Sequence, residues 1–188
     1  MQKKIAIFAS GSGSNAENII RYFQNSASFR FPLIISNRAD AYVHQRAKSL
    51  CVVSLTYEKT DFETGKAILA TLEENKIDYI VLAGFLLKIP ETIIKAFPDK
   101  IINIHPALLP KYGGKGMYGN NVHRAVRASG DSESGITIHF VNEHYDDGNI
   151  IFQKKCLIEP TDSYEDIAQK VHALEYEFFP KVIETIWG

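Results

Sequence analysis

The first 105 residues alternate five short apolar runs with segments of helical character, and this alternation constrains the fold more than any other feature. Each run has the length of a buried strand and is too short for a buried helix. The runs are KIAIFA (4–9), PLIIS (32–36), CVVSL (51–55), DYIVLA (78–83) and IINIH (101–105). Strands that alternate with helices predict an α/β fold with a doubly wound, mostly parallel sheet, in which this part is a Rossmann-like nucleotide-binding half.

The connecting segments have helical signatures. Ala16, Ile19, Ile20 and Phe23 follow the spacing i, i+3, i+4, i+7 of an amphipathic helix. Ser14 with a glutamate three residues later is a capping-box signature for the start of that helix. Further helices are expected over AYVHQRAKSL, over FETGKAILATLEE with Asp61 as its cap, and over ETIIKAF.

The last third of the chain has a different pattern. After a helix near NVHRAVRAS, the segment GITIHFV (135–141) alternates apolar and other residues, which predicts a half-exposed strand. IIFQKKCLI (150–158) is its expected hairpin partner. A final helix is expected from Ser163, with Pro180 kinking or dividing it. The sheet is therefore predicted to be extended by antiparallel strands in the C-terminal part.

Composition restricts the classes of partner. Hydrophobic residues make up 45% of the 188 and charged residues 23%, which is ordinary for a soluble globular protein. A formal net charge of −1 gives no sign of a nucleic-acid partner. No run approaches the roughly 20 apolar residues of a membrane span. Cys51 and Cys156 lie far apart in apolar runs, which predicts two buried, reduced thiols in a cytoplasmic protein.

A glycine-rich loop, GSGSNA, follows the first strand and opens the first helix. Glycines allow a tight turn and close approach to a ligand, and the free amides of a helix start favour an anion such as phosphate. Gly11, Gly13 and Ala16 also match the dinucleotide fingerprint. The acid that this fingerprint expects about 20 residues on is replaced by Asn37 and Arg38. We favour a phosphate site over an ordinary capped turn.

Asn103 and His105 stand two residues apart at the end of the fifth apolar run. Their side chains should project side by side at the carboxyl edge of the sheet, where open α/β folds bind ligands. An amide can donate to developing negative charge, and an imidazole can carry a proton near neutral pH. Asp146 and Asp147 are candidates for the carboxylate that would orient the histidine. Spacing alone leaves a partly buried histidine and an ordinary hairpin turn as an equal alternative.

The six histidines do not cluster with cysteines at zinc-ligand spacing, so no metal is implied. His123 and His139 either flank the pocket or are structural. The segment 111–121 contains four glycines and two lysines, and we expect it to be mobile without ligand and ordered over bound substrates.

The blocks GSGSN, VLAGF, NIHPALLP, GITIHFV and YDDGNII, in this order, resemble the folate-dependent formyltransferases. The resemblance covers essentially the whole chain. It is strongest to members that transfer a formyl group from 10-formyltetrahydrofolate, as co-substrate, to the amine of glycinamide ribonucleotide in purine biosynthesis. Methionyl-tRNA formyltransferase and 10-formyltetrahydrofolate hydrolase share the NIHPALLP block but carry an additional domain, for which this chain is expected to leave no room.

The resemblance implies roles for individual residues. Asn103, His105 and Asp146 match the catalytic residues of the family. The predicted substrate-binding residues are Gly13, Ser14 and Asn15 for the phosphate and Glu175 for the ribose. The predicted folate-binding residues are Leu86, Leu87, Lys88, Ile89, Asn142, Glu143, His144, Tyr145 and Asp146.

The expected organisation is a single domain over residues 1–188, with a phosphate-binding lobe at 1–100 and a catalytic and folate-binding lobe at 101–188. Two alternatives remain. The first is a formyltransferase for another amine, such as a sugar nucleotide. The second is an NADP-binding module, which would use only the glycine loop and Arg38. The expected partners are small molecules, and the sequence does not give the oligomeric state.

Overall fold

All five apolar runs form strands, and helices follow each of the first four. The computed structural model describes residues 2–188. Within that range the strands are β1 (Lys3–Phe8), β2 (Phe29–Ser36), β3 (Val53–Thr56), β4 (Tyr79–Leu82), β5 (Ile101–His105), β6 (Glu133–Phe140) and β7 (Ile150–Leu157). The helices are α1 (Ser14–Tyr22), α2 (Val43–Ser49), α3 (Asp61–Thr64), α4 (Lys66–Glu74), α5 (Glu91–Ala96), α6 (Asn120–Ser129) and α7 (Tyr164–Trp187).

The strands form one sheet in the order β3-β2-β1-β4-β5-β6-β7. β1 pairs in parallel with β2 and β4, and β2 pairs in parallel with β3. β6 and β7 form an antiparallel hairpin in which Ile138 lies opposite Phe152. The predicted fold class, a mostly parallel α/β sheet with an antiparallel C-terminal extension, is confirmed.

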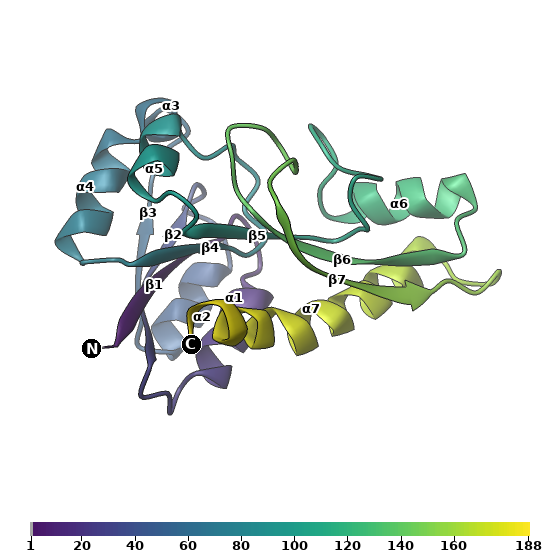
Figure 1. Cartoon of the computed structure of the whole chain (residues 1–188), viewed down its shortest axis with the longest axis horizontal. Helices are drawn as coiled ribbons and strands as arrows, with labels where there is room; N and C mark the ends of the chain where they lie inside the picture. Colours follow the sequence, from purple (N-terminus) through teal and green to yellow (C-terminus); the bar gives the residue numbers. More distant parts are fainter. Residues whose placement is uncertain (1) are drawn as a thin grey trace. The chain divides into compact units, whose positions relative to one another are not determined.

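The chain divides into two compact units, and the first runs to Ile102 and includes Gly188. Figure 1 shows α1 and α2 on one side of its strands, with α3, α4 and α5 on the other. Both faces of β1 are therefore covered, and Ile5, Ala6, Ile7 and Phe8 are all 0% exposed. A strand buried on both faces reads as a continuous apolar run, which is why the sequence showed it clearly.

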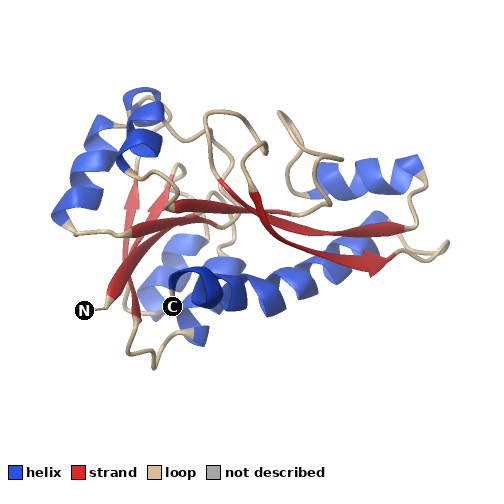
Figure 2. Ribbon diagram, in the orientation of Figure 1, coloured by secondary structure: helices blue, strands red, loops and turns tan. Residues whose placement is uncertain are grey.

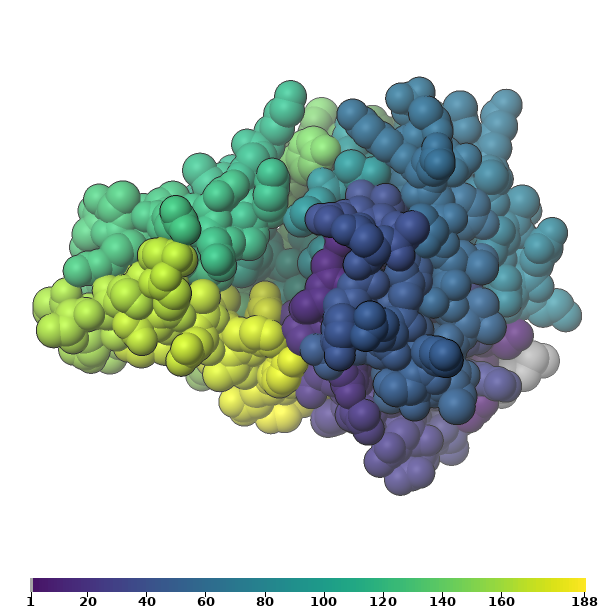
Figure 3. Space-filling model, turned by 180° about the vertical axis from the view of Figure 1, so that it is seen from behind, coloured from purple at the N-terminus to yellow at the C-terminus, as the bar shows by residue number. Residues whose placement is uncertain are grey.

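The second unit, Asn103–Trp187, contains the β6–β7 hairpin, α6 and α7. α7 packs against both strands of the hairpin, and α6 packs against α7. Figure 3 shows α6 in green beside α7 in yellow. The prediction that β6 is half-exposed is wrong, because Thr137 is 0% and His139 2% exposed. These polar side chains are buried because both make hydrogen bonds inside the unit.

Three helix predictions need correction. α1 is capped by Gly13 at φ 70° and not by Ser14, and the Glu17 carboxylate binds Arg21 and Arg46 instead of closing a capping box. The helix predicted from Asp61 is two helices, α3 and α4, separated by Gly65 at φ 70°. α7 is one helix of 24 residues with Pro180 inside it, so the proline does not divide it.

The prediction of two buried thiols is also wrong. Cys51 is exposed and Cys156 half-buried, although both are free. Cys51 lies before β3, in a turn with φ 56°, and not inside the strand. Among residues 2–188, no helix combines the length and the apolar character that a membrane crossing requires.

Candidate active site

β5 brings Asn103 and His105 into one group with a histidine of β6 and an aspartate of the β6–β7 turn. Asn103 Nδ2 lies 3.2 Å from His139 Nε2. His105 Nδ1 lies 3.6 Å from Asp146 Oδ2, and His105 is only 3% exposed. We call Asn103, His105, His139 and Asp146 the His105 cluster. All four belong to the second unit.

His139 orients the amide of Asn103. Its Nδ1 lies 2.8 Å from the carbonyl oxygen of Phe140. A carbonyl oxygen can only accept, so Nδ1 carries a proton, and in the tautomer with one ring proton Nε2 accepts from the amide. The Asn103 amide therefore donates one N–H to His139 and has a second N–H for another acceptor. The sequence left His139 undecided between a pocket residue and a structural one, and this contact gives it an orienting role.

His105 is held in one tautomer by a backbone carbonyl. Its Nε2 lies 2.7 Å from the oxygen of Tyr112, so Nε2 donates and Nδ1 faces Asp146. Burial lowers the pKa of His105, and the charge of Asp146 opposes that decrease. The lowered pKa makes His105 neutral at pH 7, with the lone pair of Nδ1 directed toward the carboxylate of Asp146. Nothing in the sequence identified Tyr112, because any residue can supply a carbonyl.

The turn between β6 and β7 contributes Asp146, whose backbone has φ 52°. Its Oδ2 accepts a hydrogen bond of 2.9 Å from the amide of Gly114, in the loop that follows β5. Figure 2 draws this loop and the β6–β7 turn in tan. Burial raises the pKa of Asp146, but His139, His105 and the Gly114 amide together bring it below its ordinary value. Asp146 is thus an ionised, half-buried carboxylate, whereas Asp147 is exposed.

Thr137 fixes the backbone that follows His105. Its hydroxyl donates to the carbonyl of Ala107 at 2.7 Å and accepts from the amide of Leu109 at 3.0 Å. Gln153 of β7 donates to the same hydroxyl at 2.9 Å. A side chain of β6 therefore anchors the exit of β5. The alternation of the strand places Thr137 on the face predicted to be exposed, so the sequence pattern does not indicate this role.

His123 of α6 is a third buried histidine, 6% exposed, and its Nδ1 has no hydrogen-bond partner within residues 2–188. Burial, together with smaller contributions from the charges of His172 and His105, lowers the pKa of His123 from an ordinary 6.5 to about 4. His123 is neutral at pH 7. It can therefore form hydrogen bonds there but does not carry a charge.

The pKa of His123 predicts a loss of stability in mild acid. The folded pKa lies below the unfolded one, so the unfolded chain binds the extra proton, and stability falls as the pH drops from 6.5 toward 4. We expect His123 alone to lower the free energy of unfolding by about 2 kcal/mol between pH 7 and pH 5. Urea unfolding at both values should show a smaller difference for His123→Asn than for the wild type. The exposed His144→Asn is the control, and an unchanged difference in His123→Asn would refute the prediction.

In the first unit, the glycine loop leads from β1 into α1. Gly13 needs to be glycine for two reasons, because it has φ 70° and because a Cβ there would lie 2.3 Å from Cγ2 of Val43. Close packing against α2 thus accounts for this glycine independently of any ligand. Ser12 is exposed, and its carbonyl accepts from Nε of Arg46 at 2.8 Å. Ser14 and Asn15 open the first turn of α1, where helix amides are available to an anion.

The strand order reverses between β1 and β4, and open α/β sheets bind ligands at the carboxyl ends of such strands. β1 leads to the glycine loop, and β4 leads to the segment from Leu86 to Ile89. Ser10 joins the two, since its amide donates to the carbonyl of Gly84 at 3.0 Å and its hydroxyl accepts from the amide of Leu86 at 2.9 Å. Leu86 and Lys88 are exposed, Leu87 is half-buried and Ile89 is buried. The two predicted binding segments of this unit are therefore neighbours.

Arg38, the residue on which the NADP alternative depends, is bound to Asp40. Its guanidinium donates to both carboxylate oxygens, at 3.1 and 2.8 Å. A 2′-phosphate would have to compete with this carboxylate. The contact makes the NADP alternative weaker.

The remaining predicted site residues lie in the second unit. Glu175 is on α7, where its Oε2 lies 3.8 Å from Nδ1 of His172. The turn segment Asn142–Tyr145 precedes Asp146, and Asn142 Oδ1 accepts from the amide of His144 at 2.8 Å. The contacts of Glu175 and of this segment are with other residues of the protein, and they do not distinguish a ligand-binding role from a structural one. Among residues 2–188, no group of three or more His, Cys, Asp or Glu side chains could hold a metal ion.

Comparison with known proteins identifies relatives over almost the whole chain. The family model for formyl transferases matches residues 3–183. Phosphoribosylglycinamide formyltransferase of Bacillus subtilis is 37% identical over 191 residues, which cover 99% of this chain and 95% of that protein. The chloroplastic enzyme of the same name from Arabidopsis thaliana is 38% identical, over 98% of this chain. This chain spans 65% of the Arabidopsis protein and 61% of the relative from Vigna unguiculata.

Solved structures give the same result. The crystal structure of glycinamide ribonucleotide transformylase 1 from Geobacillus kaustophilus matches with a TM-score of 0.91 at 33% identity, and the match covers 100% of both chains. The phosphoribosylglycinamide formyltransferase of Streptococcus pneumoniae matches with a TM-score of 0.88 at 34% identity, again over 100% of both chains.

Proposed function

Because this chain belongs to the formyl transferase family, we propose that it transfers the formyl group of 10-formyltetrahydrofolate to the amine of glycinamide ribonucleotide, a step of purine biosynthesis. The observation that carries the proposal is the His105 cluster. It combines an amide N–H available to another acceptor, a neutral imidazole and an ionised carboxylate, and both of its histidines are buried. These are the groups that acyl transfer to an amine requires.

In the proposed reaction, the amine attacks the formyl carbon and negative charge develops on the formyl oxygen. The second N–H of Asn103 donates to that oxygen. Nδ1 of His105 takes the proton that the attacking nitrogen loses, because Nε2 already carries a proton for Tyr112. Asp146 stabilises the resulting imidazolium through its charge. The C–N bond to the folate then breaks, and the His105 imidazolium returns its proton to the folate nitrogen, which restores the neutral imidazole.

The binding residues are proposed from the family resemblance and from the positions described above. The amides of Gly13, Ser14 and Asn15 would hold the substrate phosphate at the start of α1, and Glu175 would hold the ribose. The folate would contact the segments Leu86–Ile89 and Asn142–Asp146. We also propose that the enzyme acts in the cytoplasm, where free thiols such as those of this chain persist.

A turnover assay with substrates and cofactors from the competing classes tests the proposal. Purified protein with 10-formyltetrahydrofolate should formylate glycinamide ribonucleotide, and an amino sugar nucleotide should not react at a comparable rate. NADPH should show no saturable binding by fluorescence titration. Turnover of the sugar nucleotide alone would favour the first alternative, and NADPH binding without folate binding would favour the second.

A further inference from the structure

Tyr112 makes hydrogen bonds through its backbone carbonyl and through its side-chain hydroxyl, and only the carbonyl contacts the His105 cluster. Its carbonyl accepts from Nε2 of His105 at 2.7 Å. Its hydroxyl donates to Oδ2 of Asp131 at 2.8 Å and lies 2.5 Å from Oγ of Ser129. Asp131 also binds the ammonium of Lys111 at 3.1 Å. Tyr112 thus connects the imidazole of the cluster to an aspartate just beyond the end of α6.

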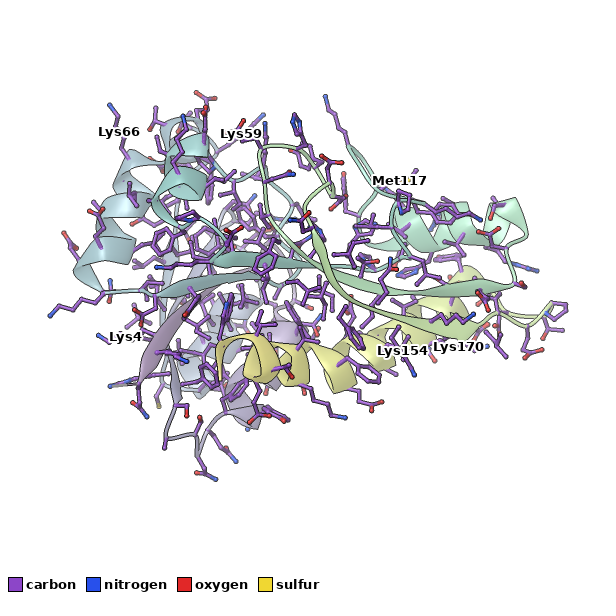
Figure 4. The ribbon with its side chains drawn as sticks, in the orientation of Figure 1. Lys4, Lys59, Lys66, Met117, Lys154 and Lys170 are labelled. Atoms are coloured by element: carbon purple, nitrogen blue, oxygen red, sulfur yellow. The ribbon has the colours of Figure 1, made fainter. Side chains whose placement is uncertain are left out.

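The backbone at Tyr112 needs such an anchor. Tyr112 has φ 57°, a left-handed conformation that bulky residues rarely adopt. Gly113 and Gly114 follow it, and glycines do not restrict the direction of the neighbouring peptide groups. Without its hydroxyl contacts, little in the local sequence would hold the Tyr112 carbonyl toward His105. Met117, labelled in Figure 4, lies further along the same loop.

The same short segment also holds the carboxylate. The Gly114 amide donates to Oδ2 of Asp146, which is the oxygen that faces Nδ1 of His105. A Cβ at Gly113 would lie 3.3 Å from Cβ of Asp146, so the loop and the turn are closely packed. Movement of residues 112–114 would therefore disturb both partners of His105 together.

The direction of the Tyr112 carbonyl decides which ring nitrogen of His105 carries the proton. While the carbonyl accepts from Nε2, the lone pair of Nδ1 is available to receive a proton. If the carbonyl moves away, the carboxylate of Asp146 favours the other tautomer, with the proton on Nδ1. That form cannot take up a second proton at Nδ1. The other charged or titratable groups that act on His105 or on its partner Asp146 are His139 of β6 and His123 of α6.

We propose that Asp131 is a positioning residue: through the Tyr112 hydroxyl it keeps the Tyr112 carbonyl on His105 and so selects the reactive tautomer. The hydrogen bond from Tyr112 and the charge of Lys111 lower the pKa of Asp131, so it remains an ionised acceptor at neutral pH. Asp131 acts on the reaction only through Tyr112. The catalytic part of this inference rests on the proposed role of His105.

Tyr112→Phe and Asp131→Leu test the link from its two ends. Tyr112→Phe keeps the ring and the carbonyl, and Asp131→Leu keeps the approximate shape of the side chain but removes the oxygen that accepts from the Tyr112 hydroxyl. We expect each to lower kcat about 10- to 100-fold, as for a displaced catalytic group, with less than about a threefold change in the KM for glycinamide ribonucleotide. The double variant should lose no more than the stronger single one, since both changes break one link. Glu133→Gln is the control. It removes a negative charge, as the change at Asp131 does, but the Glu133 carboxylate pairs with Lys155 and not with Tyr112.

The ¹⁵N chemical shifts of the His105 ring give a readout without substrate. The wild type should show the Nε2–H tautomer, and both variants should show a substantial fraction with the proton on Nδ1. Unchanged ring shifts in both variants, or a fall in kcat equal to that of Glu133→Gln, would overturn the proposal. If the wild type does not formylate glycinamide ribonucleotide, the proposed function fails, whereas the ring shifts still decide whether Asp131 sets the tautomer.

Discussion

Replacing Asp146 with asparagine is expected to lower turnover by about 10²- to 10⁴-fold, the usual contribution of acid–base assistance. The change keeps the shape of the side chain and an acceptor for the Gly114 amide. It removes the charge that opposes the effect of burial on His105. The pKa of His105 then falls further, and the imidazole loses its capacity to take the proton from the attacking amine.

His105→Ala should show a loss of the same order, because it removes the proton acceptor itself. Combining the two changes should add little to either, as for groups that act as a unit. The KM for glycinamide ribonucleotide should change much less than kcat, since the proposed phosphate and ribose contacts are made by other residues.

Asp147→Asn is the matched control. It makes the same chemical change one residue further along the same turn, at an exposed side chain. Steady-state kinetics of Asp146→Asn, Asp147→Asn and the wild type, with circular dichroism to verify folding, are sufficient. Near-normal turnover in Asp146→Asn, or equal losses in the two variants, would refute the assignment.

The shared direction of the Asn103 and His105 side chains could be predicted from the sequence because it depends on local information. Asn103 and His105 are two residues apart in a strand, so their common direction follows from strand geometry. The choice between Asp146 and Asp147 could not be made that way. It depends on the left-handed backbone of Asp146 and on the amide of Gly114, which is 32 residues away along the chain.

Contacts between distant elements account for the other differences. Glu17 lies three residues after Ser14, as in a capping box, but Arg46 of α2 binds it instead. A charge-assisted contact from another helix is stronger than a local bond to a backbone amide. Thr137 and His139 alternate with apolar residues as an exposed face would, yet both are buried because the chain around Ala107 and the amide of Asn103 satisfy them.

Placing a negative charge in the glycine loop is expected to raise the KM for glycinamide ribonucleotide about 100-fold. Ser12→Asp would bring a carboxylate to roughly 6 Å from a phosphate bound at the start of α1, at a cost of about 3 kcal/mol for an effective dielectric constant near 20. The KM for 10-formyltetrahydrofolate should change little, because its formyl and pterin groups carry no phosphate.

Ser12 is a better position for this test than Gly13. A side chain at Gly13 would be strained at φ 70° and would collide with Val43, so a loss of binding there could come from displaced helices. Ser12 is exposed, and its contact with Arg46 is made by its carbonyl oxygen, which the substitution retains. Packing in this part of the first unit should therefore be unchanged.

Ser12→Asn provides the control, since asparagine has the size of aspartate without its charge. We expect its KM for glycinamide ribonucleotide to stay within about threefold of the wild type, so that the difference between the two variants isolates electrostatic repulsion. The difference should also shrink as salt is added, because Ser12 is exposed to solvent. Equal KM values for the two variants at low salt would mean that the substrate phosphate binds elsewhere, and that close packing against Val43 is the reason for the glycine at position 13.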